Sequence, residues 1–307
     1  MQENILSIDS LQKRYQKNVA LNSISLQIPK GSVYGLIGQN GAGKTTLIRI
    51  LNKIIDIDSG TIHFNGQPIR QEDVQKIGYL PEERGLYKNM TIEEQAMYFG
   101  QLKGMTKKES KLQLDYWLNR FDISDWKKKK IQDLSKGMAQ KVQFIITVLH
   151  QPELLILDEP FSGFDPINAN LIASEIKQLA KNGTTVIFSS HRMESVAEMC
   201  DHVCLIHQGT ILLDGTITDI QKKHAQAVFE INLFEYNDAA LELFLTNTEY
   251  TVAIKHQDDE NVQLEVLPNQ DVSDNLLTEV LKIGSLHLYK QYIPSLQEIF
   301  IKTIENA

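Results

Sequence analysis

One glycine-rich segment, Gly38-Gln39-Asn40-Gly41-Ala42-Gly43-Lys44-Thr45, constrains the fold of this chain more than any other feature. It follows the apolar run Val33 to Ile37 and precedes a helical pattern that starts at Lys44. The segment matches the phosphate-binding pattern G-x-x-x-x-G-K-S/T. A glycine-rich turn without function is the alternative, but it does not require this strand and this helix on either side. The sequence therefore predicts a strand, a phosphate-binding loop and a helix in succession.

The residues of this loop have distinct predicted roles. The glycines let backbone N–H groups turn toward one point, where the helix N-terminus adds a positive partial charge. Lys44 is expected to reach the β- and γ-phosphates of a nucleotide, and Thr45 to ligate Mg²⁺. The predicted nucleotide-binding residues of this segment are Gly38, Asn40, Gly41, Gly43, Lys44, Thr45 and Thr46.

A second motif ends the apolar run Leu154 to Leu157, which has the composition of a strand covered on both faces. Asp158 follows this run directly and is predicted to lie near the Mg²⁺. Glu159 is then placed to accept a proton from an attacking water molecule. A strand that ends in Asp-Glu often means only a solvated strand end, but its combination with the phosphate loop favours the catalytic interpretation.

The bulk composition excludes some classes of protein. The chain has 307 residues and a net charge of -8, and this acidic balance argues against a nucleic-acid backbone as the main partner. Its longest apolar runs are far shorter than the roughly 20 residues of a membrane-spanning helix. With no basic-then-apolar start, we expect no secretory signal and a location in the cytosol. The two cysteines, Cys200 and Cys204, predict no disulfide framework.

Short apolar runs alternate with helical patterns as far as about residue 220, which predicts an α/β fold. Leu21 to Ile28 and Thr184 to Ser189 are further predicted strands, and Asp165 with Pro166 predicts a helix start. Residues 91–150 have a helical composition instead and are predicted to form an insertion. It begins at a capping box made by Thr91 and Glu94. Its apolar positions at helical spacing predict core packing: Leu114, Trp117, Leu118 and Phe121.

The pattern changes again after Gly215. Alternating apolar residues predict strands around Phe229, Val252 and Val262, and a helical stripe of four apolar residues follows: Leu276, Leu277, Val280 and Leu281. Ser295 and Glu298 predict a second capping box. We therefore expect two domains, an α/β domain over residues 1–224 and a small α+β domain over residues 225–307.

The segment Leu134-Ser135-Lys136-Gly137-Met138, between the two nucleotide motifs, resembles the Leu-Ser-Gly-Gly-Gln signature of ABC ATPases. The order and spacing of the motifs resemble this family over about two-thirds of the chain, and most of all its sodium-efflux and drug-export ATPases. Ser135 and Gly137 match the signature and are implied to contact nucleotide. Lys136 and Met138 depart from it, which leaves open how position 138 contacts the nucleotide.

The resemblance implies further site residues. Tyr15 stands at the position of the aromatic residue that stacks on adenine, and His191 at that of a switch histidine that senses the γ-phosphate. Glu82 replaces the glutamine that usually ends the segment Gly78 to Glu82, where a carboxylate can ligate Mg²⁺ or orient water. The loop of residues 161–165 resembles the one that crosses between two paired ATPase domains.

In this family two ATPase domains pair head to tail, and each ATP lies between the phosphate loop of one and the signature of the other. The resemblance therefore implies an ATPase that powers an exporter, with ATP and Mg²⁺ as cofactors. A second ATPase subunit, most simply a second copy, and a separate membrane permease are its implied partners. The permease contact is implied near residues 82–90 and the helical insertion, which would hold the protein at the inner face of the cell membrane.

Two other functions deserve comparison with this one. A soluble ABC ATPase that acts on nucleic acid or ribosomes typically has two ATPase units or a coiled-coil insertion, and neither is visible here. A nucleotide sensor without hydrolysis should lack the catalytic carboxylate, whereas Glu159 is present. Among weaker features, Cys200, His202 and Cys204 lack a second ligand pair for zinc, and the lysines at 127–130 predict a solvated face.

Overall fold

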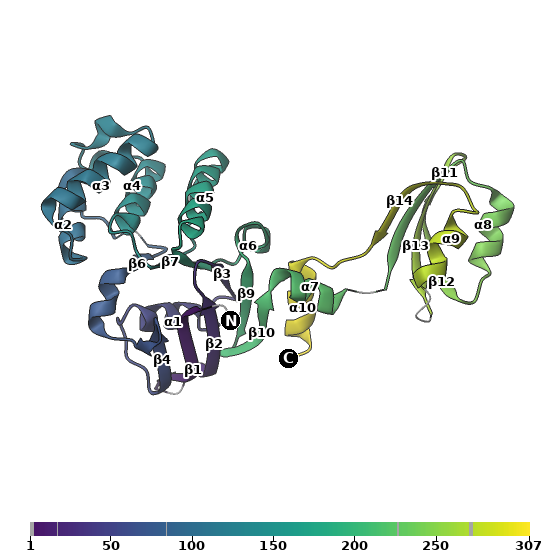
Figure 1. Ribbon diagram of the computed structural model, residues 1–307, viewed down its shortest axis with the longest axis horizontal. Coiled ribbons are helices and arrows are strands. Elements are labelled where there is room, and N and C mark those ends of the chain that lie inside the picture. The colour runs from purple at the N-terminus through teal and green to yellow at the C-terminus, as the bar shows by residue number, and fades with distance from the viewer. Residues whose placement is uncertain (1–2, 17, 84, 226, 270–272) are drawn as a thin grey trace. The chain divides into compact units, whose positions relative to one another are not determined.

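The computed structural model describes residues 3–16, 18–83, 85–225, 227–269 and 273–307 (Figure 1). The chain forms two compact units. The first comprises Met1–Ile217 together with Phe300–Ala307, and the second comprises Thr218–Ile299. Within the described residues, no helix is long and apolar enough to cross a membrane.

A six-stranded, mostly parallel sheet lies at the centre of the first unit, in the strand order β10-β9-β3-β8-β7-β6. Every residue of three of these strands, β3, β7 and β8, is buried, which explains their continuous apolar sequences. β10 alone runs antiparallel to its neighbour. The strands are β3 (Val33–Ile37), β6 (Ile77–Leu80), β7 (Leu154–Asp158), β8 (Thr185–Ser189), β9 (His202–His207) and β10 (Thr210–Thr216).

A second, antiparallel sheet has the order β2-β1-β4-β5 and packs against the helix that follows the phosphate loop. The buried side chains Leu21, Ile24 and Leu26 alternate with exposed ones on β2, which confirms the predicted half-buried strand. The elements are β1 (Asn4–Tyr15), β2 (Asn18–Pro29), α1 (Lys44–Leu51), β4 (Ser59–Phe64), β5 (Gln67–Pro68) and the 3-10 helix η1 (Gln71–Lys76). Leu47, Ile48 and Leu51 of α1 belong to the same buried cluster as both sheets.

The predicted helical insertion is present as α2 (Ile92–Leu102), α3 (Lys107–Arg120) and α4 (Lys136–Val148), with the 3-10 helices η2 (Ser124–Trp126) and η3 (Ile131–Asp133) between α3 and α4. Thr91 and Glu94 form the predicted capping box. The predicted stripe is core, since each of its members is at most 5% exposed: Leu114, Trp117, Leu118 and Phe121. Helices α5 (Pro166–Lys181), capped by Asp165 as predicted, and α6 (Met193–Met199) complete the unit.

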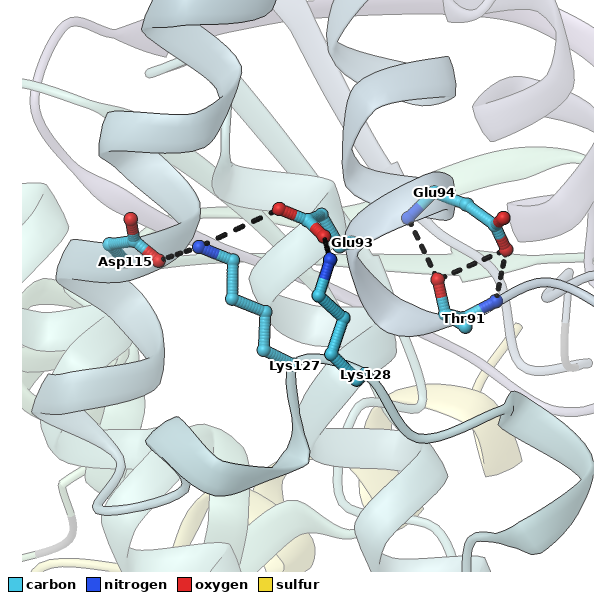
Figure 2. Close-up of polar contacts among 6 residues, drawn as sticks. All are labelled: Thr91, Glu93, Glu94, Asp115, Lys127 and Lys128. Atoms are coloured by element: carbon cyan, nitrogen blue, oxygen red, sulfur yellow. Dashed lines mark hydrogen bonds and ion pairs between the residues drawn. The ribbon is translucent and has the colours of Figure 1, made fainter.

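The lysine run at 127–130 is solvated at Lys128, Lys129 and Lys130, as predicted, but Lys127 is partly buried (Figure 2). The side chain of Lys127 is 20% exposed, and its ammonium pairs with Asp115 of α3 and Glu93 of α2. Lys128, which is well exposed, pairs with Glu93 as well. Backbone bonds from Ile92 N–H to the Lys129 carbonyl and from Glu93 N–H to the Lys127 carbonyl add to these pairs. The run therefore fastens α2 and α3 to the segment that leads into α4.

The second unit has the element order β-α-β-β-α-β, with an antiparallel sheet in the order β12-β13-β11-β14. This is the split arrangement of ferredoxin-like folds. Its elements are β11 (Phe229–Phe234), α8 (Asp238–Leu245), β12 (Tyr250–Gln257), β13 (Asn261–Pro268), α9 (Ser273–Val280) and β14 (Ser285–Gln291). The predicted stripe on α9 is half right, because Leu276 and Val280 are buried whereas Leu277 and Leu281 are exposed.

Two helices lie at the ends of this sequence region, α7 (Ile217–His224) and α10 (Leu296–Glu305). Ser295 and Glu298 form the predicted capping box at the start of α10. Strand β14 was not predicted, because its alternating residues are only partly buried and give a weak apolar pattern.

Candidate nucleotide-binding site

The phosphate loop connects β3 to α1, as the sequence predicts, and two of its glycines are required by its geometry. Gly43 stands just before α1 with φ of 116°, in the region that favours glycine. A Cβ atom on Gly43 would lie 2.6 Å from the Ala20 carbonyl oxygen, and one on Gly38 would lie 2.2 Å from the Ile206 carbonyl oxygen. The loop therefore packs directly on the backbones of β2 and β9, and this contact fixes its shape.

Lys44, the first residue of α1, lies inside this loop and is only 9% exposed. Its Nζ donates hydrogen bonds to the carbonyl oxygens of Gly38 at 2.6 Å and Gln39 at 3.1 Å. Burial lowers the pKa of Lys44, and the nearby carboxylates of Glu159 and Asp158 oppose that shift. An ammonium held in this way is a preformed ligand for an anion at the centre of the loop.

Asp158 and Glu159 lie at the carboxyl end of β7, which runs between β8 and the edge strand β6. Asp158 is 8% exposed, and burial raises the pKa of its carboxyl group, with the charges of Glu159 and Glu82 adding to the shift. Glu159 has φ of 50°, an uncommon value for a residue with a side chain. Its N–H donates to the Ser189 carbonyl at 2.9 Å, which secures this strained turn to β8.

The carboxylate of Glu159 contacts the segment that follows β8. Its Oε1 accepts a hydrogen bond from the His191 backbone N–H at 2.8 Å and lies 2.6 Å from His191 Nδ1. Its Oε2 accepts from Ser190 Oγ at 3.3 Å. The Glu159 side chain is 14% exposed and that of His191 is 61% exposed, so the histidine forms the outer wall of the site. The structure thus brings the two predicted catalytic residues into direct contact.

A cleft of about 470 Å³ opens over the phosphate loop. Ten predicted site residues line it: Tyr15, Asn40, Gly41, Gly43, Lys44, Thr45, Thr46, Glu82, Glu159 and His191. Gly38 and Asp158 lie beneath, next to Lys44. Asn18 and Ala20 also line the cleft and were missed by the sequence analysis. Asn18 pairs with Tyr15 across the β1–β2 hairpin, and this pairing is the signal that identifies it.

The signature residues are placed elsewhere on the chain. Ser135 is the N-cap of α4, and its Oγ accepts a hydrogen bond from Met138 N–H at 3.3 Å. Ser135 is exposed, and no side chain would be obstructed at Gly137, which has open space around it. Neither residue lines the cleft over the phosphate loop. Within one chain the predicted nucleotide-binding residues therefore form two separate groups.

Lys136, the departure from the family signature, packs on the loop that follows Glu159. A Cβ atom on Gly163 would lie 2.6 Å from Lys136 Cε, which shows how closely the lysine stem covers this glycine. One turn further along α4, Gln140 Nε2 donates to the Ser162 carbonyl. The start of α4 therefore supports the loop of residues 161–165, a contact that the sequence analysis did not predict.

The residues at the cleft fit a Mg²⁺ ion that also binds a nucleotide. Three carboxylates, Asp158, Glu159 and Glu82, act electrostatically on Lys44 and lie around the loop together with the exposed Thr45. No group of three or more His, Cys, Asp or Glu residues forms a metal cage in the described part of the chain. A few oxygen ligands are typical of Mg²⁺, which keeps waters and takes its other ligands from phosphates.

A phosphate loop at the end of a buried strand, an Asp-Glu pair at the end of another strand of the same parallel sheet and a helical insertion with its own capped signature define a phosphate-loop ATPase of the ABC class. Comparisons with known proteins agree. Residues 21–162 match the family model described as "ABC transporter". Residues 215–304 match the model described as "ATP-binding protein DrrA1-3-like, C-terminal domain".

Among relatives, the ABC transporter ATP-binding protein YhaQ of Bacillus subtilis is 39% identical over 98% of each chain. The linearmycin resistance ATP-binding protein LnrL of the same species is 32% identical over 97% of each chain. A solved ATP-binding subunit of an ABC transporter, 28% identical, has a TM-score of 0.67 over 71% of this chain and 92% of its own. The chain belongs to the ATP-binding proteins of ABC transporters, a family of ATPases that hydrolyse ATP to drive transport.

Proposed function

We propose that two copies of this chain pair head to tail, so that each ATP is bound by the phosphate loop of one copy and the signature of the other. The observation that carries this proposal is the separation of the two groups within one chain. The cleft is lined by Lys44, Thr45 and Glu159, whereas the exposed Ser135 and the partly buried Gly137 lie at the start of another helix. A second copy supplies the missing group to each cleft, and no other chain is needed.

Hydrolysis then follows from the groups around the cleft. Lys44 and the N–H groups of the loop stabilise negative charge on the transferred phosphoryl group. Glu159 takes the proton from the attacking water, and His191, in contact with its carboxylate, holds it in place and contacts the γ-phosphate. Thr45, Asp158 and Glu82 would hold the Mg²⁺ ion, which when bound neutralises phosphate charge. Tyr15 stacks on the adenine base at the rim.

A second pocket supports a contact with the permease. It has a volume of about 330 Å³ and mostly apolar walls, with Leu86, Phe99 and Ile146 among its lining residues. Gln143 of α4 also lines it, and its Nε2 donates to the Glu83 carbonyl at 3.4 Å. A permease segment in this pocket would touch α4, which is capped by Ser135, and the segment beside Glu82. Such a contact would carry motion from both groups of nucleotide-binding residues to the membrane.

The transported substrate is proposed to leave the cell. Among the relatives that match most of this chain, one is named for linearmycin resistance, and others named for lantibiotic transport match 68% of it. An exporter ATPase works at the inner face of the cell membrane, in the cytoplasm, and we propose that location here. Action on nucleic acid or ribosomes is not part of this proposal, and the net charge of -8 opposes it.

Co-purification from native membranes tests the proposed partners. In mild detergent the tagged chain is expected to bring down a multi-span membrane protein together with a second, differently tagged copy of itself. The Glu159→Gln variant in ATP should increase recovery of the second copy, because it binds ATP without hydrolysing it. Lys44→Ala is the matched control and should not. Recovery of ribosomal components in place of a membrane protein would contradict the proposal.

We further propose that residues 1–224 are the ATPase domain and residues 225–307 an accessory domain. The second unit has its own buried cluster, which includes Ile231, Leu264 and Val280. A chain that ends at Lys223 should therefore still bind ATP. It should unfold at a lower temperature than the full chain, because Phe300, 1% exposed, belongs to the first unit. Loss of ATP binding in a folded truncated chain would contradict this division.

A further inference from the structure

The aromatic ring at the rim of the cleft has a cation beside it. Tyr15 is the last residue of β1 and is 42% exposed. Lys13, two residues earlier and therefore on the same face of the strand, places its Nζ 5.7 Å from the centroid of the Tyr15 ring. At this distance the ammonium is attracted to the ring face. The cation lies over the ring, and the ring still lines the cleft with part of its surface exposed.

Lys13 is itself held in place by Asp58. The Lys13 side chain is only 15% exposed, and its Nζ lies 2.9 Å from Asp58 Oδ1. Asp58 Oδ2 accepts a second hydrogen bond, at 2.7 Å, from the Arg14 backbone N–H. The Asp58 N–H in turn donates to the Gln12 carbonyl at 3.0 Å. One residue therefore bonds to three consecutive residues of β1, immediately before Tyr15.

Asp58 also connects the two parts of the nucleotide site along the chain. It lies between α1, which begins at the phosphate-binding Lys44, and β4, which pairs with β1. Hydrogen bonds from Lys13 and Arg14 hold the pKa of the Asp58 carboxyl below its ordinary value, so it is a carboxylate at neutral pH. Asp58 thus adds a side-chain link between the end of β1 and the segment that follows α1, beside the pairing of β1 with β2.

We propose that Asp58 and Lys13 are positioning residues for the contact between Tyr15 and the adenine base, an inference that rests on the proposed role of Tyr15. Asp58 fixes the end of β1 relative to α1. Lys13 holds the ring and withdraws electron density from it, which favours stacking with an electron-rich purine on the ring surface that lines the cleft. Neither residue touches the phosphates, so both act only on ligands that carry a base.

The test compares ATP with inorganic triphosphate, which has the phosphates but no base. Binding of each, with Mg²⁺, is measured by calorimetric titration for Lys13→Met and Asp58→Asn. Lys13→Met removes the cation but keeps most of the aliphatic side chain. Asp58→Asn removes the negative charge and replaces one of the two acceptor oxygens with an NH₂ group, so that one of the hydrogen bonds from Lys13 and Arg14 is lost. Each variant should lose about two- to fivefold in ATP affinity and leave triphosphate affinity unchanged. Lys30→Met, which removes the ion pair with Glu3 just beyond the ends of β2 and β1, is the control and should change neither.

Tyr15→Ala distinguishes the proposed contact of Tyr15 with the base from the proposed positioning role of Lys13 and Asp58. If it leaves ATP affinity unchanged, the proposed base contact itself is wrong. If it weakens ATP binding while Lys13→Met and Asp58→Asn do not, only the positioning role is wrong. Equal losses of ATP and triphosphate affinity in Asp58→Asn would show a general structural role and would also overturn the inference. In the Tyr15→Ala background, both variants should have no further effect on ATP binding.

Discussion

The two groups of nucleotide-binding residues are held by different kinds of interaction. The phosphate loop is fixed by close packing of glycines on the backbones of β2 and β9, and by the buried strands on either side. The signature depends on a helix cap and on surface bonds: Ser135 caps α4, and Lys127 fastens the preceding segment to Glu93 and Asp115 (Figure 2). Buried packing resists small changes, whereas ion pairs that stay in partial contact with solvent contribute less each and are screened by salt.

This difference fits the different functions of the two groups, which are catalysis in the cleft and reversible contact by the signature. The cleft must present its groups in one geometry for chemistry, because small displacements of catalytic groups cost much in rate. In the proposed dimer, the signature must approach and leave a nucleotide that is bound by the other copy. Several weak interactions can hold the signature segment while allowing it to move. Changes in the cleft should therefore act on catalysis and binding, and changes around the signature should have small, salt-dependent effects.

The largest effect should follow loss of the proton acceptor in the cleft. Glu159→Gln keeps the size of the side chain but removes its basicity, and ATP turnover should fall by on the order of 10²–10⁴. Phosphate release under saturating ATP measures this. Glu194→Gln, an exposed glutamate on the nearby α6, is the control and should hydrolyse ATP normally. Near-normal turnover by Glu159→Gln would remove this residue from the proposed role.

Loss of the buried ammonium should come next. Lys44→Ala removes a charge-assisted contact with phosphate and should weaken ATP binding by on the order of tenfold to a hundredfold. Titration with ATP and Mg²⁺ measures the affinity. Lys181→Ala, at the exposed end of α5, should bind ATP as the unchanged chain does. Unchanged affinity in Lys44→Ala would mean that the loop is not the nucleotide site.

A smaller, pH-dependent effect is expected at the pocket beside α4. Burial lowers the pKa of His150 to about 4. The unfolded chain, with an ordinary value near 6.5, binds the proton first, so this term stabilises the fold above that pH and is lost as pH falls toward 4. Between pH 7 and 4.5 the loss should be about 2–3 kcal/mol. Unfolding by denaturant from pH 7 to 4.5 should show a shallower decline in His150→Gln than in a His63→Gln control; identical declines would contradict the prediction.

The smallest effect is expected at the fastening of the helical insertion. Glu93→Gln weakens the pairs with Lys127 and Lys128 and should cost about 0.5–1 kcal/mol of unfolding free energy at low salt. The difference from the unchanged chain should shrink in 1 M salt, where the Debye length falls to about 3 Å. Glu194→Gln serves as the control again. If Glu93→Gln lowers the unfolding free energy by several kcal/mol and salt does not reduce this loss, the signature region is not held by weak, salt-sensitive pairs.

Most of the residues that line the cleft could be predicted, because its motifs are contiguous in sequence and each motif residue has a single predicted role in nucleotide binding. Lys44 needs no partner distant in sequence to be recognised. Asn18 and Ala20 were missed because they reach the cleft only through the pairing of β1 with β2. Lys127 was read as solvated because a lysine run has the same composition whether or not Asp115 and Glu93 lie opposite. The contact of Lys136 with Gly163 likewise joins segments far apart in sequence.

The first compact unit is interrupted in sequence, and this has a consequence for biosynthesis. Residues Phe300–Ala307 belong to it but are synthesised only after the 82 residues from Thr218 to Ile299. At about 5–20 residues per second, a ribosome needs roughly 4–16 s to make that stretch. During this time the surface that Phe300 covers is open. The nascent chain therefore passes through a stage at which chaperones and proteases can act on an ATPase unit that still lacks its last piece.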